Sequence, residues 1–282
     1  MKLIFKTLSI ALAFALCSQF SQAQTEITPR PSSNQSITQA FGLSQVTITY
    51  SRPNRNGRKI FGGLQPYGEV WRTGANEATT IQFKDEVNVD GHQVPAGKYA
   101  LFTIPGKDEW TIILNKTANQ WGAYSYKQAD DLLRFTVKPQ TLKSTVETFT
   151  IQFENVSETA MQLHLMWENT DISIPMTIDD DARILANIEN AMQGEKKPYY
   201  AAMEYYYEHN KDLAKALEWA NILEKSDMKA TYYKLWKARI QLKMGDKAGA
   251  MATATQGLEL AKASHNDEYV RLNEAVLKAA SK

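Results

Sequence analysis

The stretch "ISIPMTIDDDARILANIENAM", residues Ile172–Met192, changes its hydrophobic period part-way along and so decides the fold. Up to Ile178 apolar and polar residues alternate, which is typical of a strand with one buried face. After the acids Asp179–Asp181, apolar residues recur at helical spacing, at Ile184, Leu185, Ile188 and Met192. Acids at a helix start complement the helix dipole, so we interpret these three as a helix start rather than a metal site.

The residues before this switch repeat the alternating pattern. In "LSQVTITY", Val46, Ile48 and Tyr50 share one face of a strand. Similar runs follow at Thr79–Lys84, Lys98–Ile104, Trp110–Asn115, Leu133–Lys138, Thr148–Phe153 and Met161–Glu168. Turns rich in Gly, Pro and Asn separate them. Many short strands broken by such turns predict an antiparallel β-sandwich, which we place at residues 40–178.

The residues after the switch repeat at an offset of 34. When Asn210–Glu224 is aligned with Met244–Leu258, matching residues are Asp212 with Asp246, Ala214 with Ala248, Ala216 with Ala250, and Ala220 with Ala254. A 34-residue period with small residues where helices cross is typical of tetratricopeptide repeats. We therefore expect tetratricopeptide-like helical hairpins in residues 179–282, closed by a capping helix at Asp267–Ala279. The groove of such hairpins commonly receives a protein or peptide partner.

The N-terminus predicts export. Lys2 and Lys6 precede a short apolar run and the small-x-small sequence Ser21–Ala23, which is the pattern of a cleaved signal peptide. We expect residues 1–23 to be removed and the product to be a soluble periplasmic or extracellular protein. Residues 24–39 are polar and include Pro29 and Pro31, so they predict a flexible segment leading into the first strand.

Composition excludes several classes of protein. The chain has 32 Lys and Arg against 31 Asp and Glu, and loss of Lys2 and Lys6 leaves 30 against 31. A neutral chain is not expected to bind nucleic acid. No run after the leader is long enough to span a membrane. The single cysteine, Cys17, lies in the leader, so disulfides, thiolate metal sites and cysteine nucleophiles are not expected.

Four long motifs resemble a known family. They are "SRPNRNGRKIFGGLQPYGEVWRTGANEATTIQF" (51–83), "VPAGKYALFTIPGKDEWTIILNK" (94–116), "QWGAYSY" (120–126) and "DLLRFTVKP" (131–139). In this order they closely resemble the secreted bacterial domain-of-unknown-function family numbered 2911, over about Gln39 to Ile178. The resemblance implies an export signal and, in some members, a helical repeat tail. It implies no activity and no catalytic residues.

The long connection 51–76 is the main candidate for a site. Its surroundings carry five cationic residues (Arg52, Arg55, Arg58, Lys59 and Arg72) against Glu69 and Glu77. Guanidinium groups bind carboxylate and phosphate in bidentate geometry, so this excess favours an anionic ligand. Exposed aromatic side chains favour a sugar. The candidate ligand-binding residues are Arg52, Arg58, Lys59, Tyr67, Trp71, Arg72, Asn76, Glu77, Trp121 and Tyr124.

A structural role competes with this interpretation. A long loop across a sandwich must satisfy its own buried polar groups. Arg72, Asn76 and Glu77 can do so by pairing within the loop, while Trp71 plugs the edge of the sandwich. The sequence leaves both roles open.

No catalytic motif is present, and we expect no cofactor and no metal. The sequence favours an exported binding protein that takes a small anionic or sugar-like ligand and docks a protein partner on its tail. Two alternatives stay open. One is a periplasmic hydrolase acting through carboxylates of the 51–77 loop, with Glu77 foremost. The other is a scaffold without a ligand.

Overall fold

The structure is a computed structural model that describes residues 28–282. The chain divides into two compact units, Met1–Asp179 and Asp180–Lys282, which we call the β unit and the helical unit. The expected signal peptide, its cleavage point after Ala23 and residues 24–27 lie outside the described residues.

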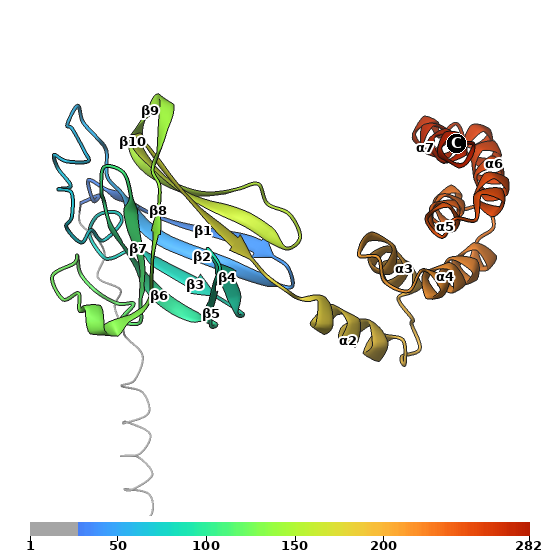
Figure 1. The fold of residues 1–282 in the computed structure, drawn as a ribbon, viewed down its shortest axis with the longest axis horizontal. Coiled ribbons are helices and arrows are strands. Elements are labelled where there is room, and N and C mark those ends of the chain that lie inside the picture. Colours follow the sequence, from blue (N-terminus) through green and yellow to red (C-terminus); the bar gives the residue numbers. More distant parts are fainter. Residues whose placement is uncertain (1–27) are drawn as a thin grey trace, which may run out of the picture. The chain divides into compact units, whose positions relative to one another are not determined.

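The β unit contains two antiparallel sheets, as the alternating pattern predicts (Figure 1). One has six strands in the order β1 (Ser33–Phe41), β2 (Ser44–Arg52), β3 (Thr80–Phe83), β6 (Gly97–Ile104), β7 (Trp110–Asn115) and β8 (Asp131–Val137). The other has four, in the order β5 (His92–Val94), β4 (Val87–Val89), β10 (Ala160–Thr177) and β9 (Gln140–Glu154). A short 3-10 helix, Gln128–Asp130, precedes β8.

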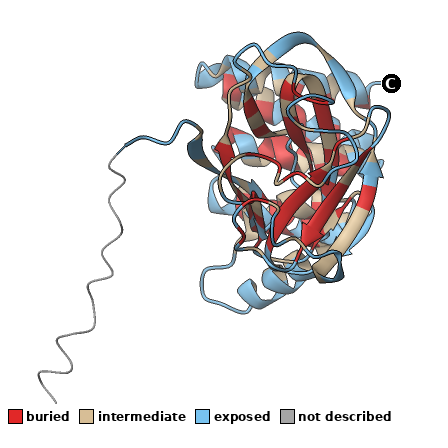
Figure 2. Cartoon of the chain, turned by 90° about the vertical axis from the view of Figure 1, so that its left-hand side faces the viewer, coloured by how far each residue is buried: buried red, intermediate tan, exposed pale blue. Residues whose placement is uncertain are grey.

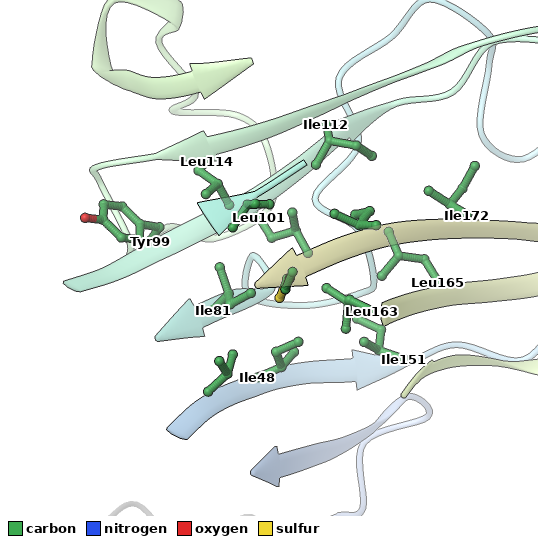
Figure 3. Packing of buried hydrophobic residues seen from close by; sticks show 14 of the residues in the cluster. Ile48, Ile81, Tyr99, Leu101, Ile112, Leu114, Ile151, Leu163, Leu165 and Ile172 are labelled. Atoms are coloured by element: carbon green, nitrogen blue, oxygen red, sulfur yellow. The ribbon is translucent and has the colours of Figure 1, made fainter. Parts of the chain in front are cut away.

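The inner faces of both sheets form one hydrophobic core. Val46, Ile48 and Tyr50 of β2 are at most 1% exposed, which confirms the face assigned from the sequence. Figure 3 shows the residues that pack here, among them Ile81, Leu101, Ile112, Ile151, Leu163 and Leu165. The buried residues follow the strands (Figure 2). Burial of each such side chain stabilises the folded state by about 1.5–3 kcal/mol. The core therefore holds together the two sheets that the loops connect.

Strand β1 corrects one expectation. Residues 33–39 belong to the segment 24–39 predicted as flexible, but they pair with β2 along its whole length. Their side chains are mostly exposed, because β1 is an edge strand with polar contacts. The hydroxyls of Ser36 and Thr49 lie 3.1 Å apart, and those of Thr38 and Thr47 2.9 Å apart. A strand held in this way carries little of the apolar alternation by which strands are recognised.

Strand β10 covers both predicted runs, Met161–Glu168 and Ile172–Ile178, in one bent element. His164 Nδ1 lies 2.9 Å from Asp171 Oδ2, whereas residues seven apart in a straight strand would be about 23 Å apart. The bend falls between them, where the register with β9 shifts on both sides of Glu168 and Glu168 has φ 55°. The bend leaves the Glu168 carboxylate facing the long loop after β2.

The helical unit contains α2 (Asp181–Ala191), α3 (Tyr199–Glu208), α4 (Leu213–Ser226), α5 (Thr231–Lys243), α6 (Lys247–Ala263) and α7 (Asp267–Ala280). The 34-residue offset is visible in the helix starts, because Asp212 caps α4 and Asp246 caps α6. The aligned alanines Ala216, Ala220, Ala250 and Ala254 are all fully buried. Small residues let paired helices approach closely, so these positions set the hairpin packing.

The acids at the start of α2 act differently from a simple cap. Asp180 occupies the N-cap position, but its side chain accepts no cap hydrogen bond and instead accepts from Arg183 at 2.6 Å. Asp181 accepts from Lys211 and Tyr205, both at 2.7 Å. The hydrogen bonds from Lys211 and Tyr205 lower the pKa of Asp181. Asp181 therefore ties α2 to α3 and to Lys211 after α3, whereas the contact of Asp180 with Arg183 lies within α2.

Candidate functional site

The long loop between β2 and β3 is anchored by aromatic packing. Trp71 is 3% exposed, stacks on Trp167 with ring centroids 5.8 Å apart, and donates from Nε1 to the carbonyl of Gly74 at 3.0 Å. Phe61 packs edge-on against Trp71 and against Trp110. The backbone N–H groups of Trp71 and Thr103 donate to each other's carbonyls. Trp71 thus takes the structural role of closing the edge of the sandwich.

The loop's arginines bind acceptors of the chain itself. Arg52 donates to Phe149 O at 3.1 Å and to Thr150 Oγ1 at 2.9 Å, which ties the loop's start to β9. Arg55 and Arg58 donate to each other's carbonyls. Arg72 Nη1 donates to Asn76 O at 2.7 Å. These contacts support the structural role that the sequence left open, in which the loop's side chains satisfy its own polar groups. They use only part of each guanidinium group.

Glu168, at the bend of β10, contacts the long loop after β2. Its Oε2 accepts from the backbone N–H of Ile60 at 3.3 Å, and its Oε1 lies 3.5 Å from Arg55 Nε. Ile60 itself is fully buried. The contacts of Glu168 therefore hold the bent strand β10 and the long loop after β2 against each other.

The backbone between Arg72 and Asn76 is strained. Thr73 has φ 54°, Gly74 φ 154° and Asn76 φ 59°. A β-branched residue such as threonine rarely adopts positive φ, and such strain persists only where the surroundings enforce it. Here Thr73 is fully buried and its carbonyl accepts from Thr79 Oγ1 at 2.6 Å. Strain of this kind gathers at functional sites more often than elsewhere.

A first cleft, which we call the arginine cleft, opens beside this strained segment. It has a volume of about 500 Å³ and is bordered by Trp71 and Trp167. Its polar groups come from Asn54, Asn56, Arg58, Gln65, Arg72 and Tyr124. The ring of Tyr124 is 82% exposed, and Arg72 lies 5.8 Å from its centroid. No aspartate or glutamate is among the described residues that line this cleft.

A second cleft, which we call the hydroxyl cleft, is bordered by Glu77 and Ala78, which directly follow this segment. It has a volume of about 770 Å³, and its lining includes Ser33, Thr49, Ser51 and Thr80. Glu77, Arg30 and the exposed Trp121 also line it. Arg30 Nη1 donates to both carboxylate oxygens of Glu77 at 2.9 Å.

Glu77 is held in its ionised form. Partial burial acts to raise the pKa of Glu77, but hydrogen bonds from its own backbone N–H and from Arg30 outweigh burial. The charge of Arg30 adds to them, and the pKa lies below its ordinary value. Glu77 therefore acts as a hydrogen-bond acceptor at neutral pH.

The structure divides the candidate residues between the two clefts. Arg58, Trp71, Arg72 and Tyr124 line the arginine cleft, and Glu77 and Trp121 line the hydroxyl cleft. Among the described residues, Arg52, Lys59, Tyr67 and Asn76 lie outside both linings. Sequence reasoning missed Arg30 and Trp167. Arg30 lay in a segment interpreted as flexible, and no local pattern marks it as the partner of a residue 47 positions away.

The helical unit brings aromatic and cationic side chains of α3 and α5 together. Tyr206 is buried against Trp219, while Tyr200 accepts a hydrogen bond from Trp236 Nε1 at 2.9 Å. Arg239 lies over the ring of Trp236, and Lys243 lies over that of Tyr207. A separate cleft of about 420 Å³ lies among residues of α2, α3 and α4. The tyrosines of α3 are thus divided between core and surface.

Two features are absent from the part of the chain that the structure describes. No group of three or more His, Cys, Asp or Glu side chains within residues 28–282 is placed to hold a metal ion. Within the same range, no helix combines the length and apolar character that a membrane crossing requires.

Comparison with known proteins settles the family. Residues 32–176 match the model of a family described as a protein of unknown function (DUF2911). The chain belongs to this family. The DUF2911 match covers most of the β unit, including the strand β1 that the sequence did not reveal, but it begins after Arg30 of the hydroxyl cleft. No curated protein and no solved structure matches the chain.

Proposed function

We propose that this chain is an exported binding protein of the cell envelope, whose arginine cleft holds a small anionic ligand. The observation that carries the proposal is the charge of that cleft. Arg58 and Arg72 line it, and no carboxylate is among its described lining residues. In a chain with almost equal numbers of acidic and basic residues, such a cleft favours carboxylate or phosphate.

The geometry of Arg72 supports this role. Its bond to Asn76 O uses one N–H of a guanidinium that carries several, and its Cζ lies 5.8 Å from the centroid of the Tyr124 ring. A guanidinium fixed at one edge loses little conformational freedom when its other edge meets a ligand. The strained segment 72–76, in which the Thr73 carbonyl accepts from Thr79 Oγ1 at 2.6 Å, keeps the group in place. The amides of Asn54, Asn56 and Gln65 supply further donors.

Two further parts of the proposal rest on the sequence. Export rests on the leader pattern of residues 1–23. Docking of a protein partner rests on the repeat character of the helical unit, in which Arg239, Lys243 and Trp236 of α5 face α3. Stacked helix pairs offer extended surfaces of this type to protein segments.

The hydrolase alternative receives less support. Glu77 is ionised and bound to Arg30, so it is poorly suited to donate a proton as a general acid. Glycoside hydrolysis commonly needs a second carboxylate about 5–10 Å away. Among the described residues that line the hydroxyl cleft, Glu77 is the sole acid.

Thermal unfolding in the presence of defined anions tests the proposal. We expect phosphate, citrate or glucuronate, added at ten times its dissociation constant, to stabilise the protein by about 1.4 kcal/mol. This corresponds to a rise of about 3–6 °C in melting temperature. The double variant R58Q/R72Q should lose the rise. The matched control R271Q removes an exposed arginine of α7 and should keep it.

The same experiment decides between the proposal and the scaffold alternative. If no anion in the panel raises the wild-type melting temperature, or if R58Q/R72Q responds as the wild type does, the arginine cleft is not an anion site.

A further inference from the structure

The hydroxyl cleft has a floor of short polar side chains on the outer face of the six-stranded sheet. The register places Asn34 of β1 opposite Ser51 of β2, and Thr49 of β2 opposite Thr80 of β3. Their neighbours Ile48, Tyr50 and Ile81 point into the core. The result is an amide and the hydroxyls of Thr49 and Thr80 across three adjacent strands, with the nearly buried Ser51 among them, and a regular sheet holds this floor in place.

Trp121 forms a wall of this cleft and is 57% exposed. Its position is fixed, because it forms an antiparallel bridge with Glu77. The loop around it is anchored by Gln120 Nε2, which donates to Thr117 O at 2.6 Å, and by Tyr126, which donates to Asp131 at 2.7 Å. A large indole held open to water on a well-anchored loop indicates a contact surface.

The hydroxyl cleft contains an acid, Glu77, beside two basic residues, Arg30 and Lys98. The Arg30–Glu77 pair brings a donor and an ionised acceptor to one place, and Lys98 and Asn119 add further donors. The arginine cleft has no such acceptor. A ligand for the hydroxyl cleft must therefore both donate and accept hydrogen bonds, and it needs no net charge.

We propose that the hydroxyl cleft binds a neutral saccharide, stacked on Trp121 and hydrogen-bonded to Glu77 and to the hydroxyls of β2 and β3. A pyranose ring has an apolar C–H face that packs on an indole. Its adjacent hydroxyls give the donors and acceptors that a carboxylate beside a guanidinium can match. The volume of about 770 Å³ lies within the range of small-ligand sites, about 300–1,000 Å³.

The test is titration of the full chain, monitored by tryptophan fluorescence and by calorimetry. The probes are chitotetraose, cellotetraose, xylotetraose and mannotetraose. We expect at least one of them to bind and to shift the emission of Trp121 to shorter wavelength. The variant W121A should weaken binding of that sugar at least about tenfold, because the stacking contact and its buried area are lost. E77Q should weaken it by about tenfold, since the charged acceptor is lost.

Matched controls separate this site from the arginine cleft. Y124A removes an exposed aromatic residue that lines the arginine cleft, and R58Q/R72Q removes its charges. Both should leave the sugar affinity within about twofold of the wild type, and W121A should melt at the wild-type temperature because Trp121 is exposed. The proposal is overturned if none of the four sugars binds, or if W121A binds as well as the wild type.

Discussion

The two clefts share one segment as a wall but depend on different parts of the fold. Arg72, Gly74 and Ala75 line the arginine cleft, and Glu77 and Ala78 line the hydroxyl cleft. The first cleft is bordered by buried indoles and strained backbone, whereas the second lies on a regular sheet. The arginine cleft should therefore be lost whenever the loop after β2 loosens. The hydroxyl cleft should tolerate more change, because its floor is part of the frame.

Removal of the Trp71 side chain should have the largest effect. W71A empties a position that packs against Trp110, Trp167 and Phe149, so we expect a loss of about 3–5 kcal/mol in the free energy of unfolding. Urea unfolding of the full chain measures this. A loss below about 1 kcal/mol would show that the loop does not depend on its aromatic anchor.

Substitution of Gly74 should come next. A Cβ at Gly74 would lie 2.9 Å from the carbonyl oxygen of Ser51, and the residue has φ 154°. We expect G74A to cost about 1–3 kcal/mol and to weaken the anion response. G68A is the matched control, because Gly68 has φ 82° with nothing within 4 Å of its added Cβ. Equal costs for the two variants would mean that the contact with Ser51 is unimportant.

Substitution of Arg72 should have a smaller effect on stability. R72A removes the hydrogen bond to Asn76 O, which contributes about 0.5–1.5 kcal/mol. The anion-induced rise in melting temperature should disappear. A much larger loss of stability would indicate that Arg72 has a purely structural role. An unchanged anion response would show that Arg72 is not part of the anion site.

The Arg30–Glu77 pair should give the smallest effect, and the effect depends on pH. Because the folded pKa of Glu77 is lowered, the pair stabilises the folded state above the ordinary carboxylate pKa of 4.5. This contribution is lost as pH falls through the lower folded value. Both side chains are more than a third exposed, so the contribution is at most about 1 kcal/mol.

The difference in unfolding free energy between the wild type and E77Q, measured from pH 7 to pH 3, tests this contribution. The difference should shrink as pH falls and should also shrink at high salt. A difference that grows in acid would contradict the assigned direction.

Much of the fold could be predicted because local patterns record it. Alternation marked β2 because one face of that strand is buried, and the repeated aspartates and alanines marked the hairpins because each pair of helices repeats the same crossing. Strand β1 was not predicted because most of its side chains are polar and exposed, although Ile37 and Phe41 pack against the core. The bend of β10 was not predicted from the sequence. It brings His164 and Asp171 into contact, and the alternation of apolar residues does not encode such a contact.

The site was predicted less completely than the fold. The cationic loop was found from its composition, but of its five cationic residues only Arg58 and Arg72 line one of the two clefts. The burial of Trp71 depends on Trp110 and Trp167 from distant strands, and the ionisation of Glu77 depends on Arg30. Such pairings arise only when the chain folds.

Native mass spectrometry of the protein isolated from the cells that naturally produce it tests the central claim most directly. We expect the wild type and R271Q to retain a small acidic molecule, and R58Q/R72Q to appear as polypeptide alone. Polypeptide alone in all three samples, or the same bound mass in R58Q/R72Q, would contradict the assignment of the arginine cleft as an anion site.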